Sequence, residues 1–471
     1  MPLTPSEFLQ EVKPQLREIV DRLAERYPYA SLLATDVDGV QVNVLDSDMA
    51  ILPSPDRERG FVVRVQTDVG FTEYSFNTLD VDAVVKRVDA LVALRRTLLE
   101  TADPLPYPGV LSDEPKTLTF VAETPQEETV TPEEALRRMV DIHRSVKENH
   151  PELANLALST QQTEVNKMFL SPARDLTQTY QYGITLAMAM AHRDAVIRSG
   201  YAARSGVQGL EILDALPQMA EKACTTARDL LDAERMTPGE YDIISDPDFT
   251  GLIAHEAFGH GTEMDMFVKH RAKGAEYLNK RVASDAVRMH DGAAAYDEVS
   301  SYAFDDEGTL AGDTLIIDDG IFRQGMADAL SALYLGVPAT GNGKRESYKR
   351  KAYTRMTNTF FEAGETSLED LMADIEHGYL LESFNSGMED PKNWGIQCVA
   401  SHAREIRNGK LTGKVFAPVY LTGYVPDLLQ SITAASPDLV LSGSGYCGKG
   451  WKEWVKTSTG GSYVRAKGRL S

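Results

Sequence analysis

Cysteine is scarce in this chain of 471 residues, which contains only Cys224, Cys398 and Cys447. Such a small, odd number of thiols cannot form a disulfide framework and favours a reducing compartment. Apolar runs are also short, since none approaches the roughly 20 residues that a membrane-spanning helix needs. The N-terminus lacks a basic segment followed by an apolar one, which is the pattern of an export signal. We therefore expect a cytoplasmic protein without a membrane partner.

Basic residues are outnumbered by acidic ones. Lys and Arg total 48 against 70 Asp and Glu, and the formal net charge is −22. Binding to nucleic acid or to an anionic membrane requires a basic surface, so both partners are disfavoured. The simplest explanation of the acidic surface is that it keeps the protein soluble. Hydrophobic residues make up 42% and charged residues 25%, which is ordinary for a globular protein, and the length allows two or three domains.

The first part of the chain alternates helix and strand signals. Thr4 and Glu7 form a possible capping box for a first helix, and further helices are predicted over Val81–Leu99 and from Thr131 onward. Hairpin and strand patterns predict antiparallel pairs for 61–67 with 70–76, and for 156–170 with 176–192. The segment Asp103–Gly109 interrupts all periodicity and is either a linker or a long surface loop.

A long connecting helix is predicted over Glu211–Glu234, and we place the main domain boundary there. Residues 1–235 would form an N-terminal mixed α/β domain. Residues 236–471 would form a strand-rich, antiparallel C-terminal domain that carries the site described next. Within it, 314–317 and 321–322 predict a hairpin across Asp318-Asp319-Gly320. The predicted fold class is therefore α+β.

The most informative segment is His255-Glu256-Ala257-Phe258-Gly259-His260, in which two histidines flank a carboxylate. In the H-E-x-x-H pattern of zinc peptidases the histidines are four residues apart and share one helix face. Here they are five apart, which places them about 140° apart on an ideal helix. Either the helix is irregular or the histidines do not share a metal. Gly259 favours irregularity because it permits a π-bulge.

The approach to this segment resembles a helix start. Residues 241–244 are predicted to form a buried strand, Asp246 a helix cap, and Pro247 a first helical position. Glu256 points partly away from the first histidine, so it could hold a water molecule as a general base. A short motif of this kind also arises by chance, and the bland alternative is a helix without a metal.

A catalytic zinc would need a third ligand, and the candidates are the remaining histidines and the three cysteines. Cys447 is favoured because its glycine-rich loop, 442–450, can approach another element closely, and Lys449 is near enough in sequence to favour a thiolate. Cys224 is predicted to be a packed helical thiol, and Cys398 a buried strand residue.

Four blocks of sequence carry a resemblance to a known family. They are Gly251–Asp265, Pro338–Tyr348, Arg355–Thr359 and Tyr446–Lys449, and they resemble, in order and spacing, the TldD/PmbA family, specifically its TldD-type zinc metallopeptidase branch. The resemblance implies a zinc ion held by His255, His260 and Cys447, with Glu256 as catalytic base. It also implies a peptidase for small or unfolded peptides that acts as a homodimer or as a heterodimer with a related subunit lacking the metal motif.

Four further residues are candidates for supporting the metal or contacting substrate. Glu263 and Asp265 follow His260 closely, and of the two we favour Glu263 as the acceptor that orients its imidazole. Asn342 lies in the glycine-rich turn 341–345, which lacks the spacing of a phosphate-binding loop; the resemblance suggests instead a place in the wall near the metal. Arg355 and Asn358 belong to the third block of the resemblance.

The predicted reaction is hydrolysis of a peptide bond by metal-activated water, with Glu256 taking the proton and delivering it to the leaving amine. Substrate would dock as an extended strand through backbone hydrogen bonds. The alternative is a non-catalytic peptide-binding or assembly subunit with a structural metal. A more distant possibility is a metal-dependent amidase for a non-peptide substrate.

Overall fold

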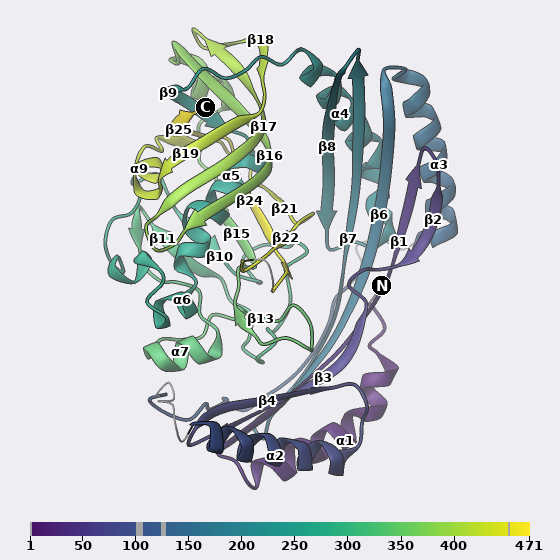
Figure 1. Ribbon diagram of the computed structural model, residues 1–471, viewed down its shortest axis with the longest axis vertical. Helices are drawn as coiled ribbons and strands as arrows, with labels where there is room; N and C mark the ends of the chain where they lie inside the picture. Colours follow the sequence, from purple (N-terminus) through teal and green to yellow (C-terminus); the bar gives the residue numbers. More distant parts are fainter. Residues whose placement is uncertain (1, 100–106, 124–128, 451–452) are drawn as a thin grey trace.

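The computed structural model describes residues 2–99, 107–123, 129–450 and 453–471. Residues 103–106, which begin the predicted linker or loop, lie outside this range. The fold is α+β, as predicted, with a long curved sheet beside a strand-rich C-terminal half (Figure 1). Among the described helices, none is long and apolar enough to cross a membrane.

Eight strands of the N-terminal half form one sheet, with the order β4-β3-β1-β6-β7-β5, β2 on β1 and β8 on β7. Their bounds are β1 Tyr29–Leu45, β2 Met49–Pro53, β3 Glu58–Thr67, β4 Gly70–Phe76, β5 Lys116–Val121, β6 Leu153–Leu170, β7 Arg174–Arg193 and β8 Val196–Gly206. The β3–β4 hairpin and the antiparallel β6–β7 pair confirm both predicted pairings.

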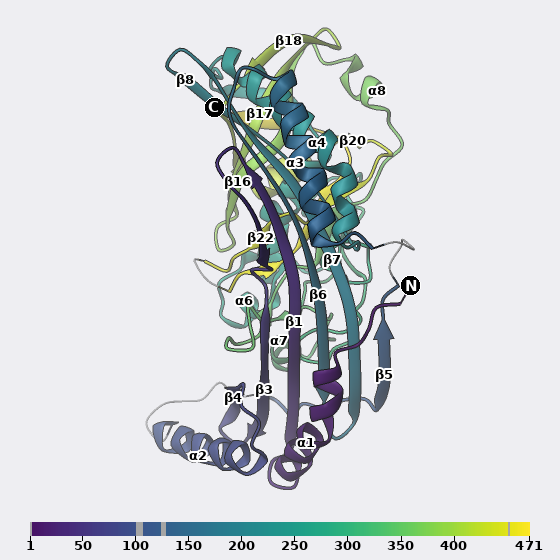
Figure 2. The same ribbon diagram turned by 90° about the vertical axis from the view of Figure 1, so that its right-hand side faces the viewer.

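Four helices pack on this sheet in two pairs (Figure 2). Helices α1 (Glu7–Ala24) and α2 (Val81–Leu99) contact each other at one end, and α3 (Pro132–Asn149) and α4 (Leu216–Asp229) lie side by side at the other. Apolar side chains from each pair and from the covered sheet face form separate cores. The predicted cap at Thr131 is confirmed, because its hydroxyl accepts from the Glu134 amide at 3.2 Å.

Two details of the predicted helices were wrong. The first helix is capped by Ser6, whose hydroxyl accepts from the Leu9 amide at 3.1 Å, and not by Thr4. The long helix predicted over 211–234 is divided into the 3₁₀ turn η1 (Leu210–Ala215), helix α4 and the 3₁₀ turn η2 (Leu230–Asp232). Pro217 explains the first break, since it has no amide hydrogen and suits the start of a new helix.

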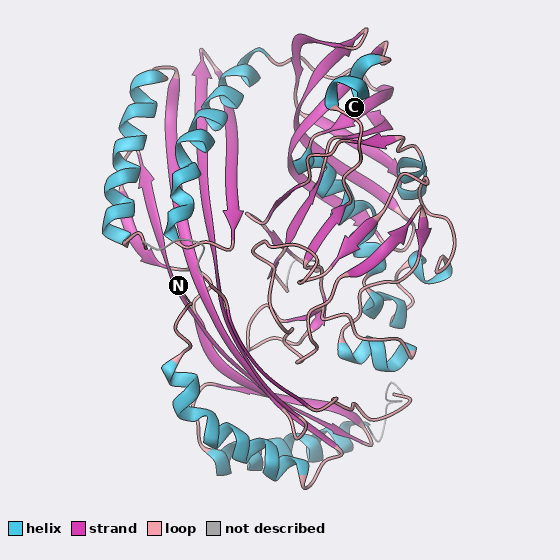
Figure 3. Ribbon diagram, turned by 180° about the vertical axis from the view of Figure 1, so that it is seen from behind, coloured by secondary structure: helices cyan, strands magenta, loops and turns pink. Residues whose placement is uncertain are grey.

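Strands of the C-terminal half form two larger sheets and two short hairpins (Figure 3). Five strands of the first sheet pair in the order β16-β9-β25-β19-β17, and β17 also pairs with β16, so these strands form a closed ring. Strand β18 pairs with β17, and β20 pairs with β25. Its bounds are β9 Gly239–Ser245, β16 His377–Asp390, β17 Gly395–Arg407, β18 Lys410–Phe416, β19 Val419–Tyr424, β20 Ala434–Ala435 and β25 Val464–Leu470.

The second sheet has the order β12-β11-β10-β15-β24-β21. Its strands are β10 Met289–Asp291, β11 Thr314–Asp318, β12 Ile321–Phe322, β15 Asn358–Phe361, β21 Val440–Ser442 and β24 Ser458–Gly461. The short hairpins are β13 (Gly343–Lys344) with β14 (Tyr353–Thr354), and β22 (Tyr446–Cys447) with β23 (Val455–Lys456). The predicted β11–β12 hairpin is confirmed. The β9–β16 and β15–β24 pairings are parallel, and the other pairings between the strands named for this half are antiparallel.

Helix α5 (Pro247–Ile253) lies in the core of the C-terminal half, where it contacts β16 and β24. Buried side chains from this helix and from both larger sheets belong to one apolar core. The other α-helices described in this half are α6 (Met264–Val268), α7 (Ala329–Leu335), α8 (Leu368–Ala373) and α9 (Val425–Gln430). The division into two domains at residue 235 stays a prediction.

Candidate metal centre

The segment that carries the two histidines begins as predicted. Strand β9 ends at Ser245, the Asp246 carboxylate accepts from the Phe249 amide at 2.8 Å, and Pro247 opens helix α5. A second oxygen of Asp246 accepts from the Ser383 amide at 2.9 Å, which ties the helix start to β16. The helix is therefore fixed at its N-terminal end before it reaches the histidines.

After Ile253 the helix widens into the π-helix η3 (Ala254–Gly259). The amide of His260 donates to the carbonyl of His255, so a five-residue hydrogen-bonded turn places the two histidines one turn apart. Their ring centroids are 5.0 Å apart and nearly perpendicular, with an interplanar angle of 86°. The predicted irregularity is confirmed, and it removes the divergence that an ideal helix would impose.

Gly259 is required here by packing and not by an unusual torsion, because its φ is an ordinary −59°. A Cβ atom at this position would lie 2.3 Å from the sulfur of Met356, which is fully buried. Cβ atoms essentially never make contacts this short. A glycine at position 259 therefore lets the backbone of the π turn lie this close to the Met356 side chain.

Cys447 reaches the histidines from strand β22. Its Sγ is 3.1 Å from His255 Nε2 and 3.4 Å from His260 Nε2, and the three possible ligand atoms lie within 4.8 Å of one another. With Zn–S of about 2.3 Å and Zn–N of about 2.0 Å, a tetrahedral ion would separate nitrogen and sulfur by about 3.6 Å. The two nitrogen–sulfur separations are close to this value, and the donor set is one that zinc prefers.

The electrostatics also suit a cation. Burial raises the pKa of Cys447, but the positive charges of His255 and His260 outweigh it and hold the pKa well below its usual range. Burial lowers the pKa of His260, whereas the Cys447 thiolate and Glu263 raise it well above its usual range. The site therefore concentrates negative charge on its sulfur, and a divalent cation would supply the positive charge that balances it.

Glu256 lies between the two histidines in η3 and is half-buried. It lines a cavity of about 780 Å³ together with His255, His260 and Cys447. Its side chain packs so closely on strand β16 that a Cβ atom at Gly387 would lie 2.5 Å from its Cγ. The carboxylate is thus held on the wall of the cavity into which the three possible ligands face.

Comparison with known proteins agrees with this geometry. The family model of the PmbA/TldA metallopeptidase C-terminal domain matches residues 238–468. These residues form a C-terminal domain of the PmbA/TldD family. The matched residues include both histidines, Glu256 and Cys447.

Relatives in the PmbA/TldD family carry metalloprotease names. A metalloprotease of Methanocaldococcus jannaschii is 34% identical over 271 residues, 57% of this chain and 59% of that protein. A metalloprotease of Synechocystis is 28% identical over 98% of both chains. A zinc metalloprotease TldD homolog of Saccharolobus solfataricus is 32% identical over 49% of this chain and 51% of its own. The crystal structure of TldE from Thermococcus kodakarensis covers 97% of this chain with a TM-score of 0.75 and 16% identity, which shows a shared fold.

Polar side chains form hydrogen bonds with two of the possible ligands, His260 and Cys447. His260 Nδ1 is 3.2 Å from Glu263 Oε2, so Glu263 is the residue that faces the imidazole. The other oxygen of Glu263 accepts from Arg355 Nε at 3.3 Å, and Arg355 Nη2 is 2.9 Å from Cys447 Sγ. Arg355 therefore links the carboxylate behind one histidine to the thiolate.

The expected role of Lys449 beside the thiolate was wrong. Its ammonium group donates to Asp265 at 2.6 Å and to the carbonyl of Thr354 at 3.0 Å, and lies 3.1 Å from Glu263. Arg355 contacts the thiolate instead, because the chain after β14 brings its guanidinium to strand β22.

Asn342 and Asn358 lie deeper in the fold and do not line the 780 Å³ cavity. Asn342 Nδ2 donates to Asp291 at 2.6 Å and to the Arg355 carbonyl at 2.9 Å. Asn358 Nδ2 donates to the carbonyls of Gly292 and Tyr296. Both amides brace neighbouring backbone segments, and only Asn342 touches a residue of the centre.

Glu389 is a cavity residue that sequence reasoning missed. It lies near the end of β16, and both of its carboxylate oxygens are buried. Burial raises its pKa well above the usual range, and the charges of Glu256 and Glu263 raise it further. The stretch 384–390 around it is otherwise largely exposed, so the sequence gives no signal of such surroundings.

Replacing Glu263 with glutamine is expected to weaken zinc binding by about 10–100-fold, because the imidazole of His260 would lose its charged partner. The measurement is competition for zinc against a chelator of known affinity. Asp265→Asn is the matched control, since Asp265 is also buried but pairs with Lys449 and Lys269 and not with a histidine. Equal affinities of the two variants would contradict the role given to Glu263.

Proposed function

We propose that the protein is a zinc-dependent peptidase in which His255, His260 and Cys447 hold the metal and Glu256 is the catalytic base. The observation that carries this proposal is the convergence of two imidazoles and one thiol, from segments almost 200 residues apart, around a cavity that also exposes a carboxylate. A purely structural site has no need for Glu256 on the same wall. The metalloprotease names of the relatives support the same class of reaction.

When bound, zinc would polarise the scissile carbonyl and lower the pKa of a water molecule towards about 7. Glu256 would accept the proton of the attacking water and then donate it to the leaving amine nitrogen. Glu263 would keep the His260 ring oriented through Nδ1, and Arg355 would hold the thiolate in place. This division of roles needs no residue beyond those that line or support the cavity.

Strand β16 supports the proposal that the substrate is an extended peptide. One of its edges pairs with β17 as far as Asp390, whereas its pairing with β9 ends at Leu381. No other described strand pairs with this second edge between Phe384 and Asp390. Residues 384–389 also line the metal cavity, so a peptide added to this edge would pass in front of the possible ligands.

Short or unfolded peptides are the proposed substrates, because backbone pairing along an edge tolerates many side chains and requires an extended chain.

We also propose that the protein works as a homodimer or with a related subunit. Light scattering of the purified chain would measure its molar mass and distinguish a monomer from these assemblies.

The experiment that tests the function compares wild-type protein with Cys447→Ala by elemental analysis and by cleavage of an unstructured peptide. Wild type is expected to hold about one zinc per chain, and the variant to lose both zinc and activity, the latter by at least about 10²-fold. Cys224→Ala is the matched control, since Cys224 is a fully buried thiol of α4 outside the centre. A metal-free wild type that still folds and binds peptide would favour a non-catalytic assembly subunit.

A further inference from the structure

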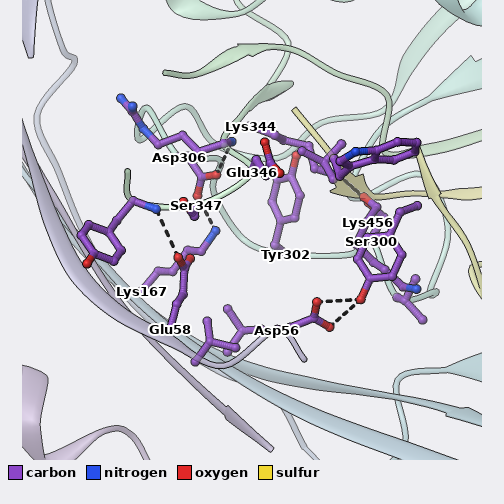
Figure 4. Close-up of a pocket in the computed structure, with 18 of the residues that line it drawn as sticks. Asp56, Glu58, Lys167, Ser300, Tyr302, Asp306, Lys344, Glu346, Ser347 and Lys456 are labelled. Carbon is purple, nitrogen blue, oxygen red and sulfur yellow. Dashed lines mark hydrogen bonds and ion pairs between the residues drawn. The ribbon is translucent and has the colours of Figure 1, made fainter. Parts of the chain in front are cut away.

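A second cavity, of about 460 Å³, lies between the N-terminal sheet and the C-terminal half (Figure 4). The sheet contributes Glu58, Lys167, Tyr180 and Tyr182, and the chain before β3 contributes Asp56. The opposite wall consists of side chains of the C-terminal half, which include Ser300, Tyr302, Lys344, Tyr446 and Lys456. The cavity is thus lined by residues of both halves.

The β22–β23 hairpin relates this cavity to the metal centre. Cys447 faces the metal centre from β22, and Lys456, on β23, pairs with the neighbouring Tyr446. Tyr446 and Trp454 line both cavities. One short hairpin therefore carries a possible metal ligand and a wall of the second cavity.

Lys456 is unusual among the cations of this cavity. Its ammonium nitrogen is buried and has no hydrogen-bond partner among the described residues. It lies 4.1 Å from the centroid of the Tyr446 ring, which compensates only part of the lost hydration. By contrast, Lys167 pairs with Asp306. A buried ammonium group without a hydrogen-bonded acceptor is costly unless a ligand supplies one.

Lys344 lies beside Lys456 on the same wall. Its three donors go to the Ser300 hydroxyl at 2.9 Å, to the Met356 carbonyl at 3.2 Å and to the Lys456 carbonyl, all uncharged acceptors. Burial lowers the pKa of Lys344 to about 7, and burial likewise lowers the pKa of Lys456 to about 8. Two neighbouring lysines thus lack a carboxylate within ion-pair distance among the described residues, and only Lys456 has donors to spare.

We propose that this cavity is a carboxylate-binding site in which the Lys456 ammonium group receives the carboxylate. A singly charged ligand fits better than phosphate, because Asp56, Glu58 and Asp306 also line the cavity and would repel a second negative charge. Several tyrosine rings in the walls suit an amide or apolar body attached to the carboxylate.

Two sources could supply this carboxylate. One is the free C-terminus of a peptide that extends from the metal centre past Tyr446, and this source rests on the proposed peptidase function. The other is a small carboxylic acid, which needs no peptidase activity. The shared chemistry is one charge-assisted hydrogen bond from Lys456, which typically contributes a tenfold or larger gain in affinity.

The test is calorimetric titration with two matched pairs of probes: benzoylglycine with its amide, and an unstructured hexapeptide with its C-terminal amide. Peptides are titrated into zinc-loaded Glu256→Gln protein, so that turnover does not interfere, and benzoylglycine into wild type. At least one acid is expected to bind about tenfold or more tightly than its amide. Lys456→Met in each background should abolish the difference, whereas Lys410→Met, at an exposed lysine of β18, should retain it.

A difference for the peptide pair alone would identify a C-terminus as the ligand, and a difference for benzoylglycine would identify a small carboxylic acid. Equal affinities of acid and amide in both pairs, or a difference that persists without Lys456, would overturn the proposal. Lys456→Met is expected to melt at the same or a higher temperature, because it removes an unpaired buried charge; Lys456→Gln serves if that variant fails to fold. Benzoylglycine binding does not depend on peptidase activity, so the two proposals can fail separately.

Discussion

Glu256→Gln is expected to retain about one zinc per chain while its kcat on an unstructured peptide falls by about 10²–10⁴-fold. Glutamine has nearly the same shape, so the close packing against Gly387 is preserved. An amide cannot accept the proton of the attacking water, and Glu256 is not one of the three possible ligands. The loss should therefore appear in kcat and not in metal content. Steady-state kinetics and elemental analysis of the same preparation measure both quantities.

Glu389→Gln is the informative comparison, because Glu389 lines the same cavity. Its raised pKa favours a protonated carboxyl, which resembles an amide in charge, so this variant is expected to keep most of its activity. If Glu389→Gln lost as much activity as Glu256→Gln, the assignment of the base to Glu256 would fail. Full activity of zinc-loaded Glu256→Gln would have the same consequence.

Local signals in the sequence were enough to predict the elements around the histidines. The order of a buried strand, Asp246, Pro247 and an apolar helix specifies a capped start, and each of these features acts over a few residues. The spacing of five between the histidines, together with Gly259, predicted the irregular turn, and η3 confirms it. The physical reason for the glycine was not predictable, because it is the sulfur of a methionine almost 100 residues later.

The rest of the site depends on contacts between segments far apart in the sequence, and local patterns did not predict those contacts. The partner of Lys449 depends on how the loop after β22 meets α6, and nearness in sequence to Cys447 wrongly suggested the thiolate. Asn342 and Asn358 belong to blocks of the family resemblance, but their amides are used to brace backbone. Glu389 becomes buried only because β16 continues past its pairing with β9 and turns that end towards η3.

Arg355→Met is expected to lower the free energy of unfolding by about 3–5 kcal/mol, because it removes one partner of a buried ion pair. The Arg355 and Glu263 side chains have exposed fractions of 0% and 1%. The change would leave Glu263 without its guanidinium partner, and the thiolate and carbonyl of Cys447 without their donor. Lys449 stays 3.1 Å from Glu263, which favours the lower end of this range. Urea denaturation of chelator-treated protein measures the change without a contribution from zinc.

Arg407→Met is the matched control for this loss. Arg407 is 49% exposed and pairs with Glu405 at 3.0 Å, so its removal is expected to cost less than about 1 kcal/mol. Repeating the denaturation with zinc present separates the loss of the ion pair from any loss of zinc affinity. If Arg355→Met binds zinc more weakly, the difference in free energy of unfolding between wild type and variant will be larger with zinc than without it. If metal-free Arg355→Met lost no more free energy of unfolding than Arg407→Met, water or Lys449 would be shown to replace the guanidinium.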